Sequence, residues 1–147
     1  MENVTFVAAV TYVVAVIVNG RDEVLLLKRS RSATLGPGQW GLPGGHLRPG
    51  EEVSAGMRRE LREELGRGMR LRLLSRLGPI AAVGMPGSRA PSGPRIHLFH
   101  FRHLAGGPDL NAEHTAWAWA DRESFASFAV LPGVAEDLAC FRVWPPR

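Results

Sequence analysis

The feature that most constrains the fold is a glycine-rich loop that leads directly into an amphipathic helix. Residues 36–50 contain six glycines, which indicates a structured loop rather than a regular element. In the next segment four apolar residues recur at intervals of four: Val53, Met57, Leu61 and Leu65. This spacing predicts a helix over 54–65 with one buried stripe. Ser54 is expected to cap its N-terminus and Gly66 to end it.

Strand patterns surround this unit. The stretch 4–18 is rich in Val and Thr, which predicts one or two buried strands rather than a membrane span or a signal peptide. Asn19–Gly20 lies between 13–18 and 24–27, so these two runs are expected to form a β-hairpin. Further strands are predicted at 69–77, 95–104 and 116–120, a mobile surface loop at 84–94, a helical turn in 121–128 and a helix over 132–143.

This order of elements indicates an α/β fold in which helices flank a mixed sheet. The chain has 147 residues, of which 45% are hydrophobic and 22% charged. These values predict a single globular domain over 1–147 and exclude a mainly disordered or coiled-coil chain. Cys140 is the only cysteine, so a disulfide scaffold is excluded and a cytoplasmic location is expected. Cys140 is interpreted as a core residue of the last helix.

The charges are unevenly distributed. The net charge is +4, and the basic residues are seventeen arginines and Lys28. Excess arginine is typical of a polyanion-binding protein, but it also follows from codon bias in a GC-rich genome, which the many Ala, Gly and Pro residues favour. Of the fourteen acids, five lie between Glu51 and Glu64, whereas 65–108 has none. Because clustered like charges repel, a counter-charge is expected at 51–64.

The acidic helix carries the candidate chemistry. Glu60, Glu63 and Glu64 are three and four residues apart, which brings their carboxylates onto one face, interpreted here as exposed. Carboxylate oxygens without a Cys or His cluster favour Mg²⁺ or Mn²⁺ over zinc. Arg59 is four residues before Glu63 and is expected to pair with it. The alternative is an ordinary solvated face of mixed charge.

The segment 45–66 resembles the Nudix box, G-x5-E-x7-R-E-U-x-E-E-x-G-U, in which U is a bulky aliphatic residue. The matching positions are Gly45, Glu51, Arg59, Glu60, Leu61, Glu63, Glu64 and Gly66. The preceding sequence from Trp40 to Gly45 is also similar to the usual lead-in of the family. Arg67 departs from the pattern because an aliphatic residue is usual there, so Met69 is expected to take the core position.

The resemblance implies an α/β/α sandwich that hydrolyses a nucleoside diphosphate linked to another moiety, with Mg²⁺ or Mn²⁺ as cofactor. It implies a role for each matched residue. Glu60 and Glu64 would be the principal metal ligands, Glu63 a further ligand or the base, the Gly44 carbonyl a backbone ligand, and Glu51 a residue that orients Arg59 or joins the metal shell. A metal-held water is a usable nucleophile near neutral pH, which suits this chemistry.

Other candidate residues lie outside the box. Family members often recruit one more carboxylate from a distant loop, and only Asp109 and Glu113 are available between the box and the C-terminal helices. Glu113 is favoured as base or ligand because it precedes the Trp117–Trp119 strand, as in similar family members. The candidate substrate-binding residues are Arg48, Phe99, Trp119 and Arg95.

The box identifies the reaction but leaves the substrate open. The compact length and the late Trp-x-Trp are most similar to the small nucleoside triphosphate pyrophosphohydrolases, which release NMP and pyrophosphate. The alternatives are an ADP-ribose or nucleotide-sugar hydrolase, a non-catalytic nucleotide-sensing domain and an RNA 5′-pyrophosphohydrolase. The expected partner is a small nucleotide, without membrane or nucleic-acid binding, and the chain is expected to be a monomer or a homodimer.

Overall fold

The computed structural model describes residues 10–82 and 93–146. The predicted strand residues 4–9 and most of the predicted loop 84–94 lie outside these ranges. Within the described ranges there are seven strands: β1 (Thr11–Val18), β2 (Val24–Arg29), β3 (Trp40–Gly41), β4 (Gly44–His46), β5 (Arg70–Ala81), β6 (Arg95–Ala105) and β7 (His114–Ala120). The three helices are α1 (Val53–Leu65), α2 (Arg122–Phe125) and α3 (Val134–Cys140). No helix in the described ranges is long and apolar enough to span a membrane.

The sheet is mixed, as the sequence predicts. Its main path runs β3-β2-β1-β6-β5, with β4 paired to β1 and β7 paired to β2. The pair β1–β6 is parallel and the other pairs are antiparallel. Strand β1 is central, because it pairs along its full length with β6 and at its first half with β4. The glycine-rich segment 44–46 is thereby attached to the middle of the sheet.

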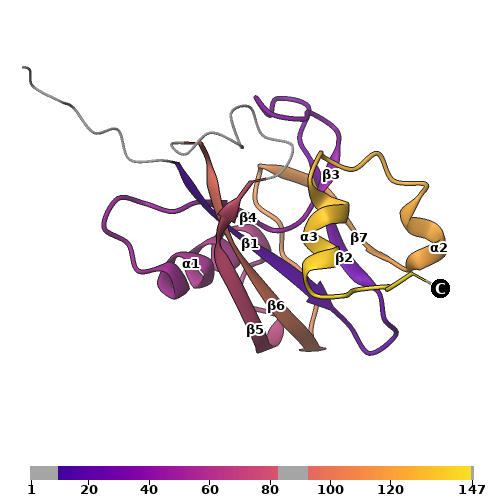
Figure 1. Ribbon diagram of the computed structural model, residues 1–147. Coiled ribbons are helices and arrows are strands. Elements are labelled where there is room, and N and C mark those ends of the chain that lie inside the picture. Colours follow the sequence, from indigo (N-terminus) through magenta and orange to yellow (C-terminus); the bar gives the residue numbers. More distant parts are fainter. Residues whose placement is uncertain (1–9, 83–92, 147) are drawn as a thin grey trace, which may run out of the picture.

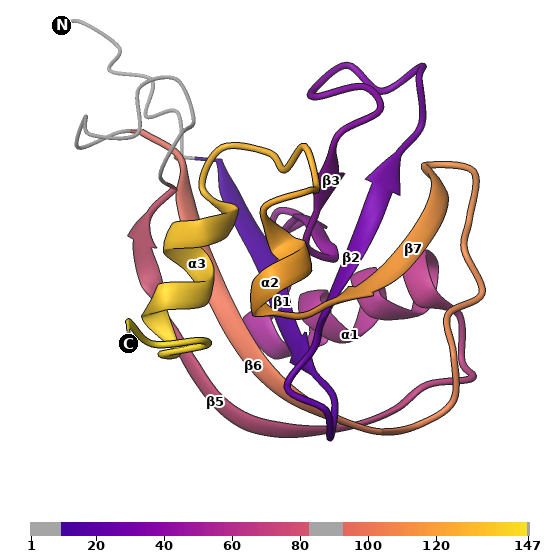
Figure 2. The ribbon, with the colours of Figure 1, turned by 90° about the vertical axis from the view of Figure 1, so that its right-hand side faces the viewer.

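The helices lie on opposite faces of the sheet (Figures 1 and 2). Figure 2 shows α1 on the far face and α2 and α3 on the near face. Alternate residues of β1 contribute to two cores: Val13, Ala15 and Ile17 pack with α1, whereas Val16 and Val18 pack with α3. Burial on both faces explains the continuous apolar run of β1. The expected α/β/α sandwich is confirmed.

The β1–β2 hairpin is confirmed. Val18 pairs with Val24, and the Asn19 backbone N–H donates to the Glu23 carbonyl over 2.9 Å. The Asn19 side-chain oxygen accepts from the Glu23 N–H over 3.0 Å. Asp22, at φ 60, takes the left-handed position. A longer loop closed by the Asn19 side chain therefore replaces a tight Asn-Gly turn.

Two further local predictions need correction, and two others are confirmed. The side chain of Glu52, not Ser54, caps α1, because its oxygens accept from the Ser54 and Ala55 N–H groups over 3.0 and 2.8 Å. Gly66 ends α1 as predicted. Cys140 is exposed rather than buried, because it is the last residue of an α3 that is shorter than expected. Met69 packs against the α1-side core, as the departure at Arg67 predicts.

Candidate active site

Helix α1 directs two of its carboxylates into the protein. The exposed fractions of Glu60 and Glu64 are 8% and 2%. This corrects the expectation of three carboxylates on an exposed face, since only Glu63 is exposed, with 45% of its side chain accessible. A buried carboxylate is unfavourable unless partners compensate it. The contacts of Glu60 and Glu64 therefore define the candidate site.

The glycines of β4 make room for these carboxylates. The Gly44 N–H donates to Glu64 Oε2 over 3.2 Å. A Cβ atom on Gly45 would lie 2.7 Å from Cδ and both oxygens of Glu60. A Cβ atom on Gly44 would lie 2.2 Å from the Val13 carbonyl oxygen. Only glycine fits between β1 and α1 at these two positions, because any larger residue would displace strand or carboxylate.

The electrostatics of Glu64 reflect this enclosure. Burial raises the pKa of Glu64 to about 9, and the Gly44 N–H opposes the rise. The negative charges of Glu60 and Glu113 raise the pKa of Glu64 further. Glu113 ends the loop between β6 and β7, and its effect on Glu64 indicates that this loop approaches the site. A bound cation would relieve the repulsion among these carboxylates.

Arg59 links four groups around the site. Its guanidinium donates to both oxygens of Glu51 over 2.8 and 2.9 Å, to Glu60 over 2.9 Å and to Glu63 over 3.2 Å. It also donates to the His46 carbonyl over 3.0 Å. These hydrogen bonds, together with the Arg48 N–H, lower the pKa of Glu51 to about 2. The forked pair fixes the Arg59 rotamer, in agreement with the expectation that Glu51 orients Arg59.

The donor set fits a hard divalent cation. Glu60, Glu64 and the Gly44 carbonyl offer only oxygen, which Mg²⁺ and Mn²⁺ prefer. The fit rests on Glu60 and Glu64, two buried carboxylates with too few hydrogen-bond donors around them, among the described residues, to satisfy all their oxygen lone pairs. Within 10–82 and 93–146, no three Asp, Glu, His or Cys side chains are already placed as a complete metal site. Any cation would therefore complete its shell with water or substrate oxygens, as Mg²⁺ usually does.

Two other predicted site residues lie at the edge of this cluster. Arg48 is exposed, and its guanidinium is 3.5 Å from Glu63 Oε1. The Glu113 side chain is exposed, while its backbone carbonyl accepts from the Ser30 N–H over 2.9 Å. Both side chains are accessible to solvent, and that of Arg48 is engaged with Glu63.

The other predicted substrate-binding residues are not gathered with the carboxylates. The Phe99 ring is 1% exposed; the Arg76 guanidinium lies 5.0 Å from its centroid, and the Phe101 ring stacks at 6.1 Å. Trp119 is half-buried and packs against His103, with ring centroids 5.0 Å apart. Arg95 begins β6 opposite Thr11 of β1, so β1 lies between Arg95 and the glycines of β4. A base stacked on Phe99 would have to displace the Arg76 side chain.

One polar residue next to the site carries no signal in the sequence beyond its position after Glu113. His114 is 8% exposed, and its Nδ1 atom has no hydrogen-bond partner among the described residues. Burial, with a smaller contribution from the Arg29 charge, lowers its pKa to about 4. His114 is therefore neutral at physiological pH. A lone histidine at a strand end is common, so only the structure distinguishes this one.

Comparison with known proteins agrees with this geometry. The protein-family model named NUDIX domain matches residues 9–141 of this chain. A nucleoside triphosphatase NudI from Enterobacter sp. (strain 638) is 40% identical over 52 residues. That match covers 35% of this chain and 37% of the relative, so the chain spans just over a third of the length of this relative.

Solved structures share the fold over nearly the whole chain. A MutT protein from Methanosarcina mazei Go1 has a TM-score of 0.67 and 24% identity, covering 95% of this chain and 97% of its own. An ADP-ribose pyrophosphatase from Streptococcus suis 89-1591 has a TM-score of 0.67 and 21% identity, covering 95% of each chain. At this identity the likeness concerns the fold.

Proposed function

Because this chain belongs to the Nudix hydrolase family, we propose that it is a Mg²⁺-dependent pyrophosphohydrolase of nucleoside triphosphates that releases NMP and pyrophosphate. The observation that carries the proposal is the buried pair Glu60 and Glu64, which faces the glycines of β4. Burying two carboxylates side by side serves no purpose in folding and is unfavourable without a cation. The acidic positions of the box are all filled, which argues against a non-catalytic sensing domain.

Each residue of the cluster then has a distinct task. Glu60, Glu64 and the Gly44 carbonyl would hold the cation. A bound Mg²⁺ would neutralise phosphate charge and lower the pKa of a water molecule. Arg59 holds Glu60 in position and keeps Glu51 ionised through the forked contact. These contacts pre-organise the cluster before substrate arrives.

The proton acceptor is assigned to Glu113, with Glu63 as the alternative. Glu113 is exposed, and its charge acts on Glu64, which supports its assignment as the proton acceptor. Glu63 is paired with Arg59 and Arg48, so its oxygens are already engaged with two guanidinium groups. Glu113→Gln is expected to lower kcat more than KM, whereas an effect on KM alone would favour Glu63.

The substrate class rests on weaker support than the reaction. The partial likeness to a NudI nucleoside triphosphatase favours triphosphates. The shared fold with an ADP-ribose pyrophosphatase keeps ADP-ribose as the second candidate. We place the activity in the cytoplasm, in a single domain over 1–147, as a monomer or homodimer that does not bind nucleic acid.

A product assay tests the proposal. Purified protein would be incubated with Mg²⁺ and separately with the four dNTPs, 8-oxo-dGTP, ADP-ribose, a nucleotide sugar and a 5′-triphosphate RNA, and the products would be separated. NMP and pyrophosphate from the triphosphates are expected. Cleavage of ADP-ribose or the nucleotide sugar alone would replace the triphosphate assignment. Binding of Mg²⁺ without any turnover would leave the sensing domain as the function.

A further inference from the structure

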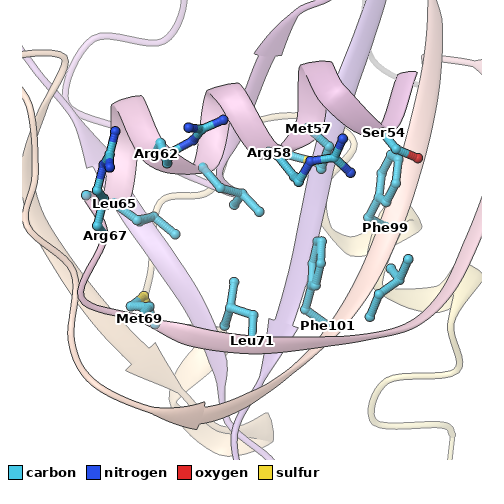
Figure 3. A pocket seen from close by; sticks show the side chains of 13 residues that line it. Ser54, Met57, Arg58, Arg62, Leu65, Arg67, Met69, Leu71, Phe99 and Phe101 are labelled. Atoms are coloured by element: carbon cyan, nitrogen blue, oxygen red, sulfur yellow. The ribbon is translucent and has the colours of Figure 1, made fainter. Parts of the chain in front are cut away.

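Helix α1 borders a second concave surface on the side away from the carboxylates. This groove lies between α1 and strands β5 and β6 and has a volume of about 530 Å³ (Figure 3). Its volume falls within the roughly 300–1,000 Å³ range of small-molecule sites. Its floor is apolar: Met57, Leu65, Met69, Leu71, Leu73 and Phe101. Of these floor residues Leu73 is the most accessible, with 47% exposed, whereas Met57 and Leu65 are each 1% exposed.

The rim of this groove is basic. Arg58, Arg62 and Arg67 line it from the helix side and are exposed. Arg76 closes one end, donating to Ser54 Oγ over 2.6 Å. No Asp or Glu is among the lining residues.

Two acids lie at the ends of the groove. Glu52 is engaged as the cap of α1. At the other end Asp109 approaches Gly66. The three rim arginines outnumber these two acids, so the rim carries net positive charge. Arg67 belongs to the acid-free stretch 65–108, whereas Arg58 and Arg62 lie in the segment 51–64.

An occupant of this groove must bring apolar surface and negative charge together. The lining stretch of α1 runs from Ser54 to Gly66, about 18 Å of helix at the usual rise. Such an elongated apolar floor suits an extended acyl chain. The guanidinium groups on the rim suit a carboxylate or phosphate head group. We propose that this groove binds a small amphipathic organic anion, an acyl carboxylate or acyl phosphate, with its head on Arg58 and Arg62.

The groove is separate from the candidate active site. The lining positions 54, 57, 58, 61, 62 and 65 form one stripe of α1, whereas Glu60, Glu63 and Glu64 occupy the opposite side. A ligand in the groove therefore need not compete with a Mg²⁺-bound nucleotide. If the proposed hydrolase activity is refuted, the proposed ligand site in the groove still stands. If the groove binds no ligand, the proposed activity still stands.

Calorimetric titration with decanoate below its micelle concentration tests the proposal, with uncharged decanamide as the matched ligand. One decanoate per chain is expected, and it should stay bound with saturating Mg²⁺ and pyrophosphate. Decanamide is expected to bind at least about fivefold more weakly, as for the loss of an exposed ion pair. Equal binding of the two ligands, displacement by pyrophosphate, or no binding of decanoate would overturn the proposal.

Variants of β5 and α1 locate the ligand. Leu73 lines the groove and is 47% exposed, so Leu73→Glu should fold normally and abolish decanoate binding. Leu74 is 46% exposed but does not line the groove, so Leu74→Glu is the matched control. Arg62→Gln should weaken decanoate binding about fivefold and Arg72→Gln should not. Equal effects within either pair of variants would refute the site, with thermal melting used to verify folding.

Discussion

Glu64 is the residue at which the proposed function conflicts most strongly with stability. Burial raises its pKa to about 9, from an ordinary value of 4.5. An acid whose pKa is raised in the folded state contributes nothing unfavourable below its unfolded pKa. The unfavourable contribution grows as the pH rises from 4.5 to about 9 and is constant above that. At pH 7 the protein must therefore fold with a proton on Glu64 that the unfolded chain has released.

The magnitude follows from the distance between pH 7 and the ordinary pKa. Each pH unit in this interval corresponds to about 1.4 kcal/mol, so the contribution reaches about 3 kcal/mol at pH 7. Glu64→Gln keeps the shape and the contact with the Gly44 N–H but needs no proton. The variant is therefore expected to be more stable than the wild type by up to about 3 kcal/mol at pH 7 and equally stable below pH 4.5. It is also expected to lose turnover, because a neutral amide is a poor Mg²⁺ ligand.

Urea unfolding in the presence of EDTA at pH 5 and pH 8 measures this difference. Glu63→Gln is the matched control, because it removes an exposed carboxylate and should change stability by less than about 1 kcal/mol. Added Mg²⁺ should stabilise the wild type but not Glu64→Gln. A Glu64→Gln protein that is no more stable at pH 8, or one that still turns over substrate, would refute the reasoning.

Three further predictions concern the surroundings of Glu64. Gly45→Ala should push the Glu60 carboxylate aside and raise the Mg²⁺ concentration needed for turnover by about ten- to a hundredfold; Gly20→Ala, where a Cβ atom meets nothing within 4 Å, should not. Arg59→Lys should lower turnover by a similar factor, because an ammonium group cannot form the forked contact; unchanged kcat/KM would contradict this. His114, with its pKa lowered to about 4, should destabilise the fold as the pH falls below 6.5, by up to about 2 kcal/mol at pH 5. Urea unfolding of wild type and His114→Gln should therefore diverge between pH 7 and pH 5, and a constant difference would be evidence against the assignment.

The sequence predicts those parts of the site that depend on helical spacing. The ion pair of Arg59 with Glu63 follows from a separation of four residues, and the structure confirms it at 3.2 Å. The burial of Glu60 and Glu64 does not follow, because it depends on β4 approaching from a segment about twenty residues earlier. The β1–β2 hairpin is likewise predictable from the sequence only in part. Its two strands follow from their composition, whereas the left-handed position at Asp22 depends on the hydrogen bonds that Asn19 makes.

The glycines around α1 explain why the box requires its residues at fixed distances. A Cβ atom on Gly56 would lie 2.3 Å from Leu47 Cδ1 and 2.9 Å from Glu51 Oε1, just as one on Gly45 would meet Glu60. The two glycines therefore leave space for one carboxylate each, on either side of Arg59. Arg59 then holds both carboxylates in that space through charged hydrogen bonds. The geometry of the cluster therefore depends on the two glycines as much as on the acidic residues. A larger residue at either glycine should disturb the site even though every acidic residue is still present.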